Sequence, residues 1–198
     1  MVAEKRPLES TTRTFDTIKG ELTYAELSDL IAPKLLQLLD DITDGKYLDM
    51  PFDETLIKNF HYQIIGDLMP QIAGKWRTIP VQVGNWLPPE PYEIPAKMHE
   101  YVANMQARLD NSDTLELQVE TLAYAEGEFL HIHPFQDFNG RTIRATLSEI
   151  LMRFDLPLID TAVGRETSRF KEYQNALAEY DNGRMAALID FWQDRLSA

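Results

Sequence analysis

The chain has 198 residues, a length that suits one domain with a full hydrophobic core. It contains no cysteine, which excludes disulfide bonds, cysteine zinc sites and thiol nucleophiles. Its net charge of −13 opposes nonspecific binding to nucleic acid or to anionic membranes. Because no stretch has the pattern of a secretory signal or the length of a membrane span, we expect a soluble cytoplasmic protein with no nucleic-acid partner and no membrane partner.

The first part of the chain combines a polar start with two helical patterns. Residues 1–20 are polar and aperiodic, which predicts an arm or a frayed end. Apolar residues then recur at helical spacing over residues 24–39 and again over residues 53–69. Thr23 precedes the first of these helices and Glu26 follows three positions later, which is the arrangement of a capping box.

One segment has the pattern of a β-strand. Residues 77–83 alternate at period two, with Gly74 before them and turn-forming pairs after them at residues 84–85 and 88–89. Pro80 has no N–H to donate to a neighbouring strand, so this strand must have a free edge. We therefore predict a strand over residues 77–83 as part of a single small hairpin.

The rest of the chain is helical in pattern. A third helix begins at Pro95 and runs out at the turn-like residues 110–112. The other predicted helices cover residues 114–131, a stretch from just beyond Asn139 to Phe154, and residues 166–180 and 185–196. The fold class we predict is mostly α, a helical bundle with a small β-hairpin, in a single domain over residues 1–198.

The densest group of chemically useful side chains lies in residues 133–144, which read His-Pro-Phe-Gln-Asp-Phe-Asn-Gly-Arg-Thr-Ile-Arg. Pro134 disfavours helical geometry at His133, so the preceding helix should end there and the chain should turn. A new helix should start just after Asn139 and Gly140. The N–H groups and the dipole of its first turn form an anion site, and glycine lets a phosphate approach the backbone closely.

Charged side chains around this turn suit a nucleoside triphosphate. Arg141 and Arg144 are three positions apart, so both guanidinium groups can lie on one face of the new helix and grip phosphates. Asp137 is a lone carboxylate just before them, which suits Mg²⁺ that is shared with phosphates and waters. His133 could take a proton from an incoming hydroxyl. Each residue alone has an ordinary structural interpretation, but the combination favours a catalytic site.

The same residues resemble the signature of the Fic (filamentation induced by cAMP) family, His-x-Phe-x-Asp/Glu-Gly-Asn-Gly-Arg-x-x-Arg. The match is carried by His133, Phe135, Asp137, Asn139, Gly140, Arg141 and Arg144. Residues 74–83 and 87–89 resemble the flap hairpin of the family. We place a Fic-like core at about residues 55–195, after an N-terminal arm and helix at about residues 1–50.

The resemblance implies a protein adenylyltransferase, which transfers AMP from ATP to a Ser, Thr or Tyr hydroxyl of a target protein. By that analogy His133 is the general base and Asp137 holds Mg²⁺. The phosphates of ATP would be held by the amides and side chains of Phe138, Asn139, Gly140, Arg141 and Arg144. The target chain would bind along the flap, about residues 75–85, by adding a strand to its open edge.

Phe138 departs from the signature, because the family has its first glycine at that position. A glycine takes positive φ without strain and leaves room for phosphate, whereas phenylalanine in that conformation is strained and adds a large ring. The ring could point outward and leave the amide available, or it could narrow the phosphate site. Since every residue with a direct chemical role is intact, we favour an active enzyme over a catalytically impaired Fic-fold interaction module.

Two further features concern regulation and the transferred group. The inhibitory helix of many Fic proteins carries Ser/Thr-x-x-x-Glu-Gly/Asn, and neither residues 17–21 nor residues 168–172 are followed by the required last residue. Control by a separate small antitoxin-like protein and the absence of such control both stay open. The related Doc branch has lysine in place of the second glycine and transfers phosphate. Gly140 is retained here, which favours AMP transfer, with another nucleotide or phosphate donor as the alternative.

Overall fold

The computed structural model describes residues 13–164 and 167–197, which form a mostly helical fold with one small hairpin. The helices are α1 (Tyr24–Thr43), α2 (Glu54–Ile65), α3 (Ile94–Asn111), α4 (Leu115–Ile132), α5 (Asn139–Arg153), α6 (Ser168–Asp181) and α7 (Ala186–Ser197), with a 3-10 turn η1 (Pro91–Glu93) before α3. The strands are β1 (Thr14–Thr17) and β2 (Gly20–Thr23). The predicted fold class is confirmed.

Local sequence signals determine where the helices begin. Thr23 and Glu26 form the predicted capping box at the start of α1, in which each side chain bonds the backbone of the other. Asp53 caps α2 by accepting a backbone N–H at 2.8 Å, and Thr114 caps α4 in the same way at 3.3 Å. The predicted helices are all present, with ends shifted by a few residues. α1 runs through Pro33, as the predicted range does, and is longer than predicted because it ends at Thr43.

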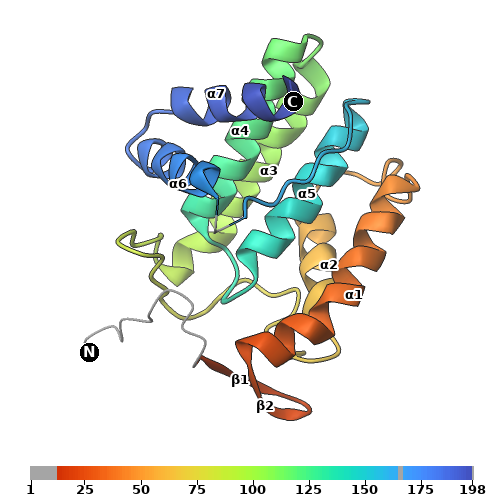
Figure 1. Cartoon of the computed structure of the whole chain (residues 1–198), viewed down its shortest axis with the longest axis vertical. Helices are drawn as coiled ribbons and strands as arrows, with labels where there is room; N and C mark the ends of the chain where they lie inside the picture. Colours follow the sequence, from red (N-terminus) through yellow and green to blue (C-terminus); the bar gives the residue numbers. More distant parts are fainter. Residues whose placement is uncertain (1–12, 165–166, 198) are drawn as a thin grey trace.

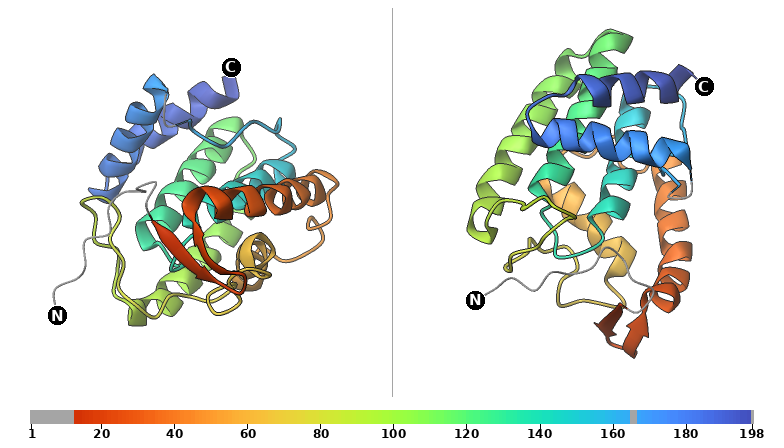
Figure 2. Two further views of the ribbon diagram at one scale, coloured as in Figure 1. Left: turned by 60° about the horizontal axis from the view of Figure 1, so that its bottom comes forward. Right: turned by 60° about the vertical axis from the view of Figure 1, so that its left-hand side comes forward.

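α5 is the central helix of the bundle. It packs against α1, α2 and α4, while α6 and α7 cover α4 and each other (Figures 1 and 2). α4 and α6 approach closely because Gly127 has no side chain: a Cβ there would come within 2.4 Å of the Tyr180 ring. One continuous hydrophobic core joins these helices. In the described part of the chain no helix has both the length and the apolar composition needed to cross a membrane.

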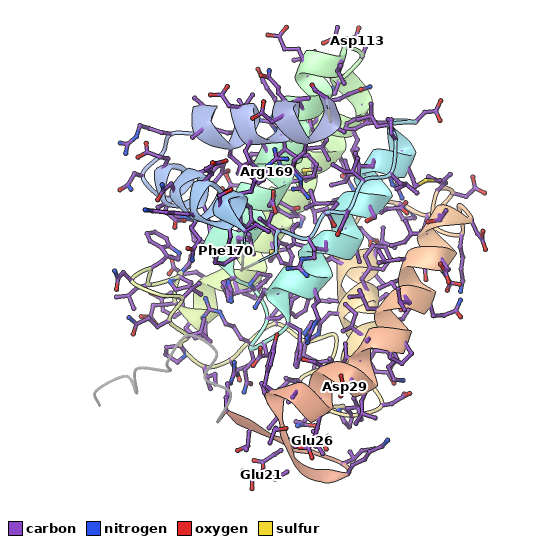
Figure 3. The ribbon with its side chains drawn as sticks, viewed as in Figure 1. Glu21, Glu26, Asp29, Asp113, Arg169 and Phe170 are labelled. Atoms are coloured by element: carbon purple, nitrogen blue, oxygen red, sulfur yellow. The ribbon has the colours of Figure 1, made fainter. Side chains whose placement is uncertain are left out.

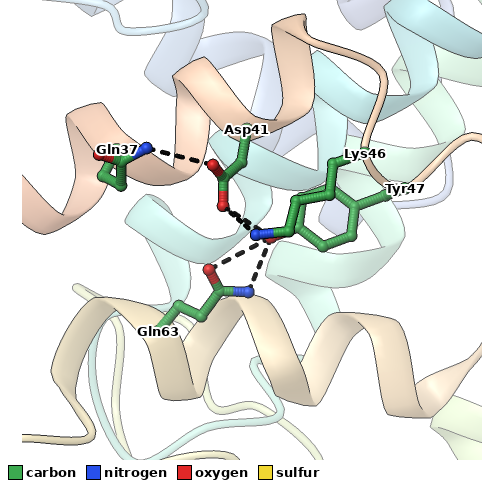
Figure 4. A network of polar contacts seen from close by, with 5 residues as sticks. All are labelled: Gln37, Asp41, Lys46, Tyr47 and Gln63. Atoms are coloured by element: carbon green, nitrogen blue, oxygen red, sulfur yellow. Dashed lines mark hydrogen bonds and ion pairs between the residues drawn. The ribbon is translucent and has the colours of Figure 1, made fainter.

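Polar contacts hold α1 against α2 at their surface (Figure 4). Asp41 accepts hydrogen bonds from Lys46 at 2.6 Å and from Gln37 at 3.1 Å. Gln63 on α2 donates to the Tyr47 hydroxyl at 2.9 Å, and the Tyr47 ring is buried. These contacts fix the two helices that cover one side of α5, and α5 carries half of the conspicuous sequence motif.

The prediction of a strand over residues 77–83 is wrong. Within the described residues this segment is irregular, with one isolated bridge between Val83 and Trp86. The backbone N–H of Arg77 bonds a carbonyl of the loop between α4 and α5 at 2.9 Å instead of a neighbouring strand. Pro80 has no N–H, so it cannot extend a ladder. The period-two pattern of residues 77–83 therefore does not correspond to the two faces of a sheet, and Arg77 is the buried residue of this segment.

The hairpin lies instead at residues 14–23, which overlap the end of the segment 1–20 that was predicted to be an aperiodic arm. β1 and β2 are antiparallel, with Thr14 opposite Thr23, and Gly20 takes the positive φ of 97° that the turn requires. Figure 3 labels Glu21, which is on β2, and Glu26, which is in the first turn of the helix that follows the hairpin. The remainder of the predicted arm, residues 1–12, lies outside the described residues.

Candidate active site

Residues 133–138, here called the motif loop, connect α4 to α5 and bend twice through left-handed backbone. His133 ends α4 with φ 51° and ψ 60°, and Phe138 precedes α5 with φ 60° and ψ 15°. Between them Phe135 is fully buried, and its ring stacks on His61 with 3.8 Å between centroids. The predicted end of one helix at His133 is confirmed, and the next helix begins at Asn139, slightly earlier than the predicted start just after Asn139 and Gly140. Phe135 anchors the loop in the core.

Asn139 closes the motif loop. Its Oδ1 accepts the Phe135 N–H at 2.9 Å, its Nδ2 donates to the Phe135 carbonyl at 2.8 Å, and the residue is 2% exposed. The side chain of Asn139 is therefore engaged in holding the loop. Its backbone N–H lies in the first turn of α5, where N–H groups lack an acceptor within the helix and point toward any bound anion.

His133 presents a neutral imidazole at the end of α4. Its backbone N–H donates to the Phe129 carbonyl at 2.9 Å, which fixes the residue to the helix. Nδ1 is buried and has no hydrogen-bonding partner among residues 13–164 and 167–197. Burial lowers the pKa of His133 to about 4, and the positive charge of Arg77 acts in the same direction. The ring is therefore uncharged at neutral pH and able to accept a proton.

Arg77 holds the backbone at His133 in place, a role that the sequence pattern did not reveal. The residue is 3% exposed, and its backbone N–H bonds the Pro134 carbonyl at 2.9 Å. Its guanidinium donates to the carbonyls of His133 at 2.8 Å, Pro89 at 2.6 Å, Ile79 at 3.2 Å and Ile132 at 3.4 Å. Two of these carbonyls end α4, where the helix dipole favours a cation. Arg77 thus ties the segment predicted as the flap to the candidate base.

His61 on α2 also supports the motif loop and was not predicted. Its ring is fully buried, its Nδ1 accepts the Gly74 N–H at 2.9 Å, and its Nε2 lies 3.1 Å from the Asp137 carbonyl oxygen. Because Nδ1 is an acceptor, Nε2 must carry the proton and donate it to Asp137. This neutral form satisfies both nitrogens, and burial lowers the pKa of His61 to about 4.

Acid is expected to weaken the fold through these two histidines. His61 and His133 have pKa values of about 4 in the folded chain, whereas an unfolded histidine titrates near 6.5. As the pH falls from about 6.5 to about 4, the unfolded chain binds protons that the folded chain excludes, so the free energy of unfolding decreases. Urea unfolding at about pH 7 and about pH 5 measures the decrease. His61→Gln should show a smaller decrease than the wild type, and an equal one would contradict this account.

Asp137 offers a single carboxylate at the turn. Its Oδ2 forms an ion pair with Arg13, its Oδ1 accepts the Phe138 N–H at 3.0 Å, and its side chain is 19% exposed. The described residues contain no group of three or more His, Cys, Asp or Glu side chains that could hold a metal ion. One carboxylate fits Mg²⁺ when a nucleotide brings phosphate oxygens and the ion keeps waters as its other ligands.

The first turn of α5 has open space and two arginines. A Cβ added at Gly140 would meet no atom within 4 Å. Arg141 reaches α1, where its Nη2 donates to the Ser28 hydroxyl at 2.9 Å. Arg144 lies toward α4, where its charge opposes the rise in pKa that burial imposes on Glu126. The Arg141 guanidinium is thus bonded toward α1, and the open space beside Gly140 leaves room for a bound group at the first turn of α5.

Phe138 packs inward beneath the hairpin. It is 6% exposed, with its ring centroid 6.0 Å from that of Phe15 and 5.4 Å from the guanidinium carbon of Arg141. Of the two alternatives left open by the sequence, the outward ring that leaves the amide available is therefore excluded. The ring is buried because Phe15 provides an apolar surface, and the amide donates to Asp137. The residue also keeps the left-handed backbone that glycine adopts more easily.

Phe138→Gly is expected to destabilise the fold even though it relieves a strained backbone. Relief of strain at positive φ gains roughly 1 kcal/mol, whereas loss of a buried aromatic ring costs roughly 3–5 kcal/mol. We expect the free energy of unfolding, measured in urea, to fall by roughly 2–3 kcal/mol. Phe15→Ala removes the ring that faces Phe138. The double variant should therefore lose less unfolding free energy than the sum of the losses in the two single variants. A Phe138→Gly protein as stable as the wild type would contradict the packing described here.

Known proteins match the region around this site in sequence. Residues 51–151 match the model of the Fic/DOC family. The protein adenylyltransferase fic-1 of Caenorhabditis briggsae is 35% identical over 102 residues, and the protein adenylyltransferase Fic of Drosophila melanogaster is 34% identical over 101 residues. Each alignment covers 51% of this chain but only 19% and 20% of those relatives, respectively. The chain therefore spans about a fifth of the length of the curated relatives that it matches.

Solved structures match almost the whole chain. BepC, a VirB-translocated effector of Bartonella tribocorum with bound AMPPNP, has a TM-score of 0.73 at 14% identity, covering 95% of this chain and 94% of that one. The N-terminal Fic domain of an effector from Bartonella sp. AR 15-3 has a TM-score of 0.78 at 15% identity, with coverage of 93% and 88%. A Fic domain from Bartonella quintana with bound ADP has a TM-score of 0.70 at 15% identity, with coverage of 92% and 90%. At these identities the likeness establishes the fold.

Proposed function

The chain belongs to the Fic/DOC family, and we propose that it transfers AMP from ATP to a hydroxyl group of a target protein. The observation that carries the proposal is the placement of His133, whose backbone carbonyl is held by Arg77 at one end of the motif loop while the other end of the loop opens α5. Two comparisons support it. The curated relatives are named protein adenylyltransferases, and two of the structural neighbours hold AMPPNP and ADP.

The proposed reaction uses each charged group of the site. The hydroxyl oxygen of the target attacks the α-phosphorus of ATP, the bond from that phosphorus to the bridging oxygen breaks, and pyrophosphate leaves with the electron pair. His133 accepts the proton of the hydroxyl. The first N–H groups of α5, with Arg141 and Arg144, stabilise the charge on the phosphates. Mg²⁺ bound by Asp137 and phosphate oxygens would add positive charge at the leaving group.

Residues 75–85 are the proposed docking segment for the target chain. Ile79 and Val83 are each 37% exposed, and the nearby Leu87 is 65% exposed, so the segment offers apolar side chains to a partner. Its backbone forms one isolated bridge, which leaves main-chain groups for an added strand. Arg77 belongs to this segment and bonds the backbone of His133. A target chain bound along the segment would therefore have its hydroxyl at a fixed position relative to the proposed base.

The contacts already made by the proposed metal and phosphate ligands favour the alternative of a catalytically impaired interaction module. Asp137 is paired with Arg13, Arg141 is bonded to Ser28 on α1, and the Phe138 amide is bonded to Asp137. Groups assigned to the metal and the phosphates thus already have partners within the chain. The alternative predicts that the protein binds nucleotide weakly or not at all.

Intact-mass measurement after incubation with ATP and Mg²⁺ tests the proposal, because Fic enzymes often modify themselves. An added adenylyl mass in the wild type that is absent in His133→Ala is the expected result. An adduct in Phe138→Gly but not in the wild type would support the impaired module. An adduct of equal size in His133→Ala would overturn the role of the histidine.

A further inference from the structure

The N-terminal hairpin, which Figure 2 shows next to the start of α1, is hydrogen-bonded to other segments at several points. The Ile18 N–H donates to the Leu68 carbonyl at 2.9 Å, and the Gln71 side chain donates to the Asp16 carbonyl at 3.2 Å. The Tyr24 N–H donates to the Arg13 carbonyl at 3.1 Å, which closes the hairpin onto the start of α1. The hairpin lies outside residues 51–151, the part that matches the family model.

The hairpin covers the motif loop with apolar surface. Phe15 is 5% exposed and lies between Tyr24, at 6.3 Å between ring centroids, and Phe138, at 6.0 Å. The Arg13 guanidinium lies 4.4 Å from the centre of the Phe15 ring. This cation–π contact holds the Arg13 side chain on the side of the motif loop. The phenylalanine that replaces the first motif glycine thus forms the base on which the hairpin sits.

Two charged groups of the proposed nucleotide site are engaged from this N-terminal segment. Arg13 forms an ion pair with Asp137, the proposed Mg²⁺ ligand. Arg141, a proposed phosphate ligand, donates to the Ser28 hydroxyl at 2.9 Å and the Tyr24 hydroxyl at 3.4 Å. A guanidinium and a divalent cation cannot share one carboxylate at close range without strong repulsion. Occupation of Asp137 by Arg13 and by Mg²⁺ should therefore exclude one another.

We propose that the hairpin is a built-in inhibitory clamp, in which Arg13 acts as the resident cation of Asp137 and is displaced when Mg²⁺ and nucleotide bind. The inference rests on the proposed nucleotide site. The Arg13 side chain is 26% exposed, and the body of the hairpin is held by Phe15 and by backbone bonds. Release therefore requires the arginine to swing away while the strands stay docked. A partly exposed ion pair of this kind lowers the affinity of the competing ligand by about two- to fivefold.

Titration calorimetry of the full chain with AMPPNP, in Mg²⁺ and in EDTA, tests the clamp. Arg13→Gln should bind AMPPNP about two- to fivefold more tightly than the wild type in Mg²⁺, and the difference should vanish in EDTA. Arg13→Lys should behave as the wild type, because it keeps a cation at Asp137. Lys19→Gln is the matched control, since it removes the same charge from the exposed turn of the hairpin. It should leave the affinity unchanged.

The outcomes separate the clamp from the proposed function. Equal affinities in Arg13→Gln and the wild type would overturn the clamp, and so would weaker binding, which would make Arg13 a nucleotide ligand. Absence of binding in every variant would instead overturn the nucleotide site. Hydrogen exchange gives a second readout that needs no substitution. Mg²⁺ with AMPPNP should leave the exchange of the Tyr24 amide, which bonds the Arg13 carbonyl, unchanged because the strands stay docked, and faster exchange would contradict displacement of the side chain alone.

Discussion

Replacing His133 with alanine should slow AMP transfer by about 10²–10⁴-fold, because no other group would take the proton of the attacking hydroxyl. The affinity for ATP should stay within about twofold, since the phosphates are held by α5 and the arginines and not by the imidazole. Transfer rates at saturating ATP, compared with calorimetric affinities for AMPPNP, measure the two quantities separately.

His131→Ala is the matched control for this result. His131 lies two positions before His133 at the same helix end, but its Nδ1 contacts Asp181 at 2.9 Å and its ring faces Trp86. It belongs to the packing between α4 and α6, so transfer should be nearly unchanged per folded molecule. An equal loss in both variants would show that the effect reports a damaged helix end and not a lost base.

Arg77→Met should lower both stability and turnover. The substitution keeps an apolar stem but leaves four carbonyls without their donor, and buried polar groups that lose their partners cost roughly 1–3 kcal/mol each. We expect the free energy of unfolding, measured in urea, to fall by roughly 4 kcal/mol or more. In the folded fraction, turnover should fall by about 10²-fold, because the backbone at His133 is no longer fixed.

Arg77→Lys separates positioning from folding. An ammonium group can reach one or two of the carbonyls, so the fold should recover more than the geometry of His133 does. The account predicts a stability between those of Arg77→Met and the wild type, an unchanged KM for ATP and a turnover still reduced by about tenfold. Full turnover in a folded Arg77→Lys or Arg77→Met protein would contradict a positioning role for this residue.

The motif loop could be predicted from sequence because its rules are local. Pro134 ends α4, and the residues suited to chemistry lie close together along the chain, within residues 133–144. The supporting residues follow no local rule. Arg77 and His61 meet the loop across 56 and 76 positions of sequence, and their neighbours in the chain give no sign of these contacts.

The same reasoning explains the two errors at the flap and at the N-terminus. Residues 77–83 alternate at period two, and this pattern was mistaken for the two faces of a strand. Arg77 is in fact buried because its guanidinium donates hydrogen bonds to backbone carbonyls. The real strands are four residues each, and Phe15 is the one buried residue in them. A Lys19-Gly20 turn between Thr-rich segments was the available signal. Because Phe15 was assigned to an arm, the direction of the Phe138 ring could not be predicted.

The most direct test of the central claim is to follow which phosphate of ATP becomes attached to protein. The purified chain would be incubated with Mg²⁺ and ATP labelled at either the α- or the γ-phosphate, with His133→Ala as the blank. Transfer of the α-label, lost in His133→Ala, is the predicted result, because AMP transfer keeps the α-phosphate and releases the other two as pyrophosphate. Transfer of the γ-label would contradict the account and assign the site to phosphate transfer.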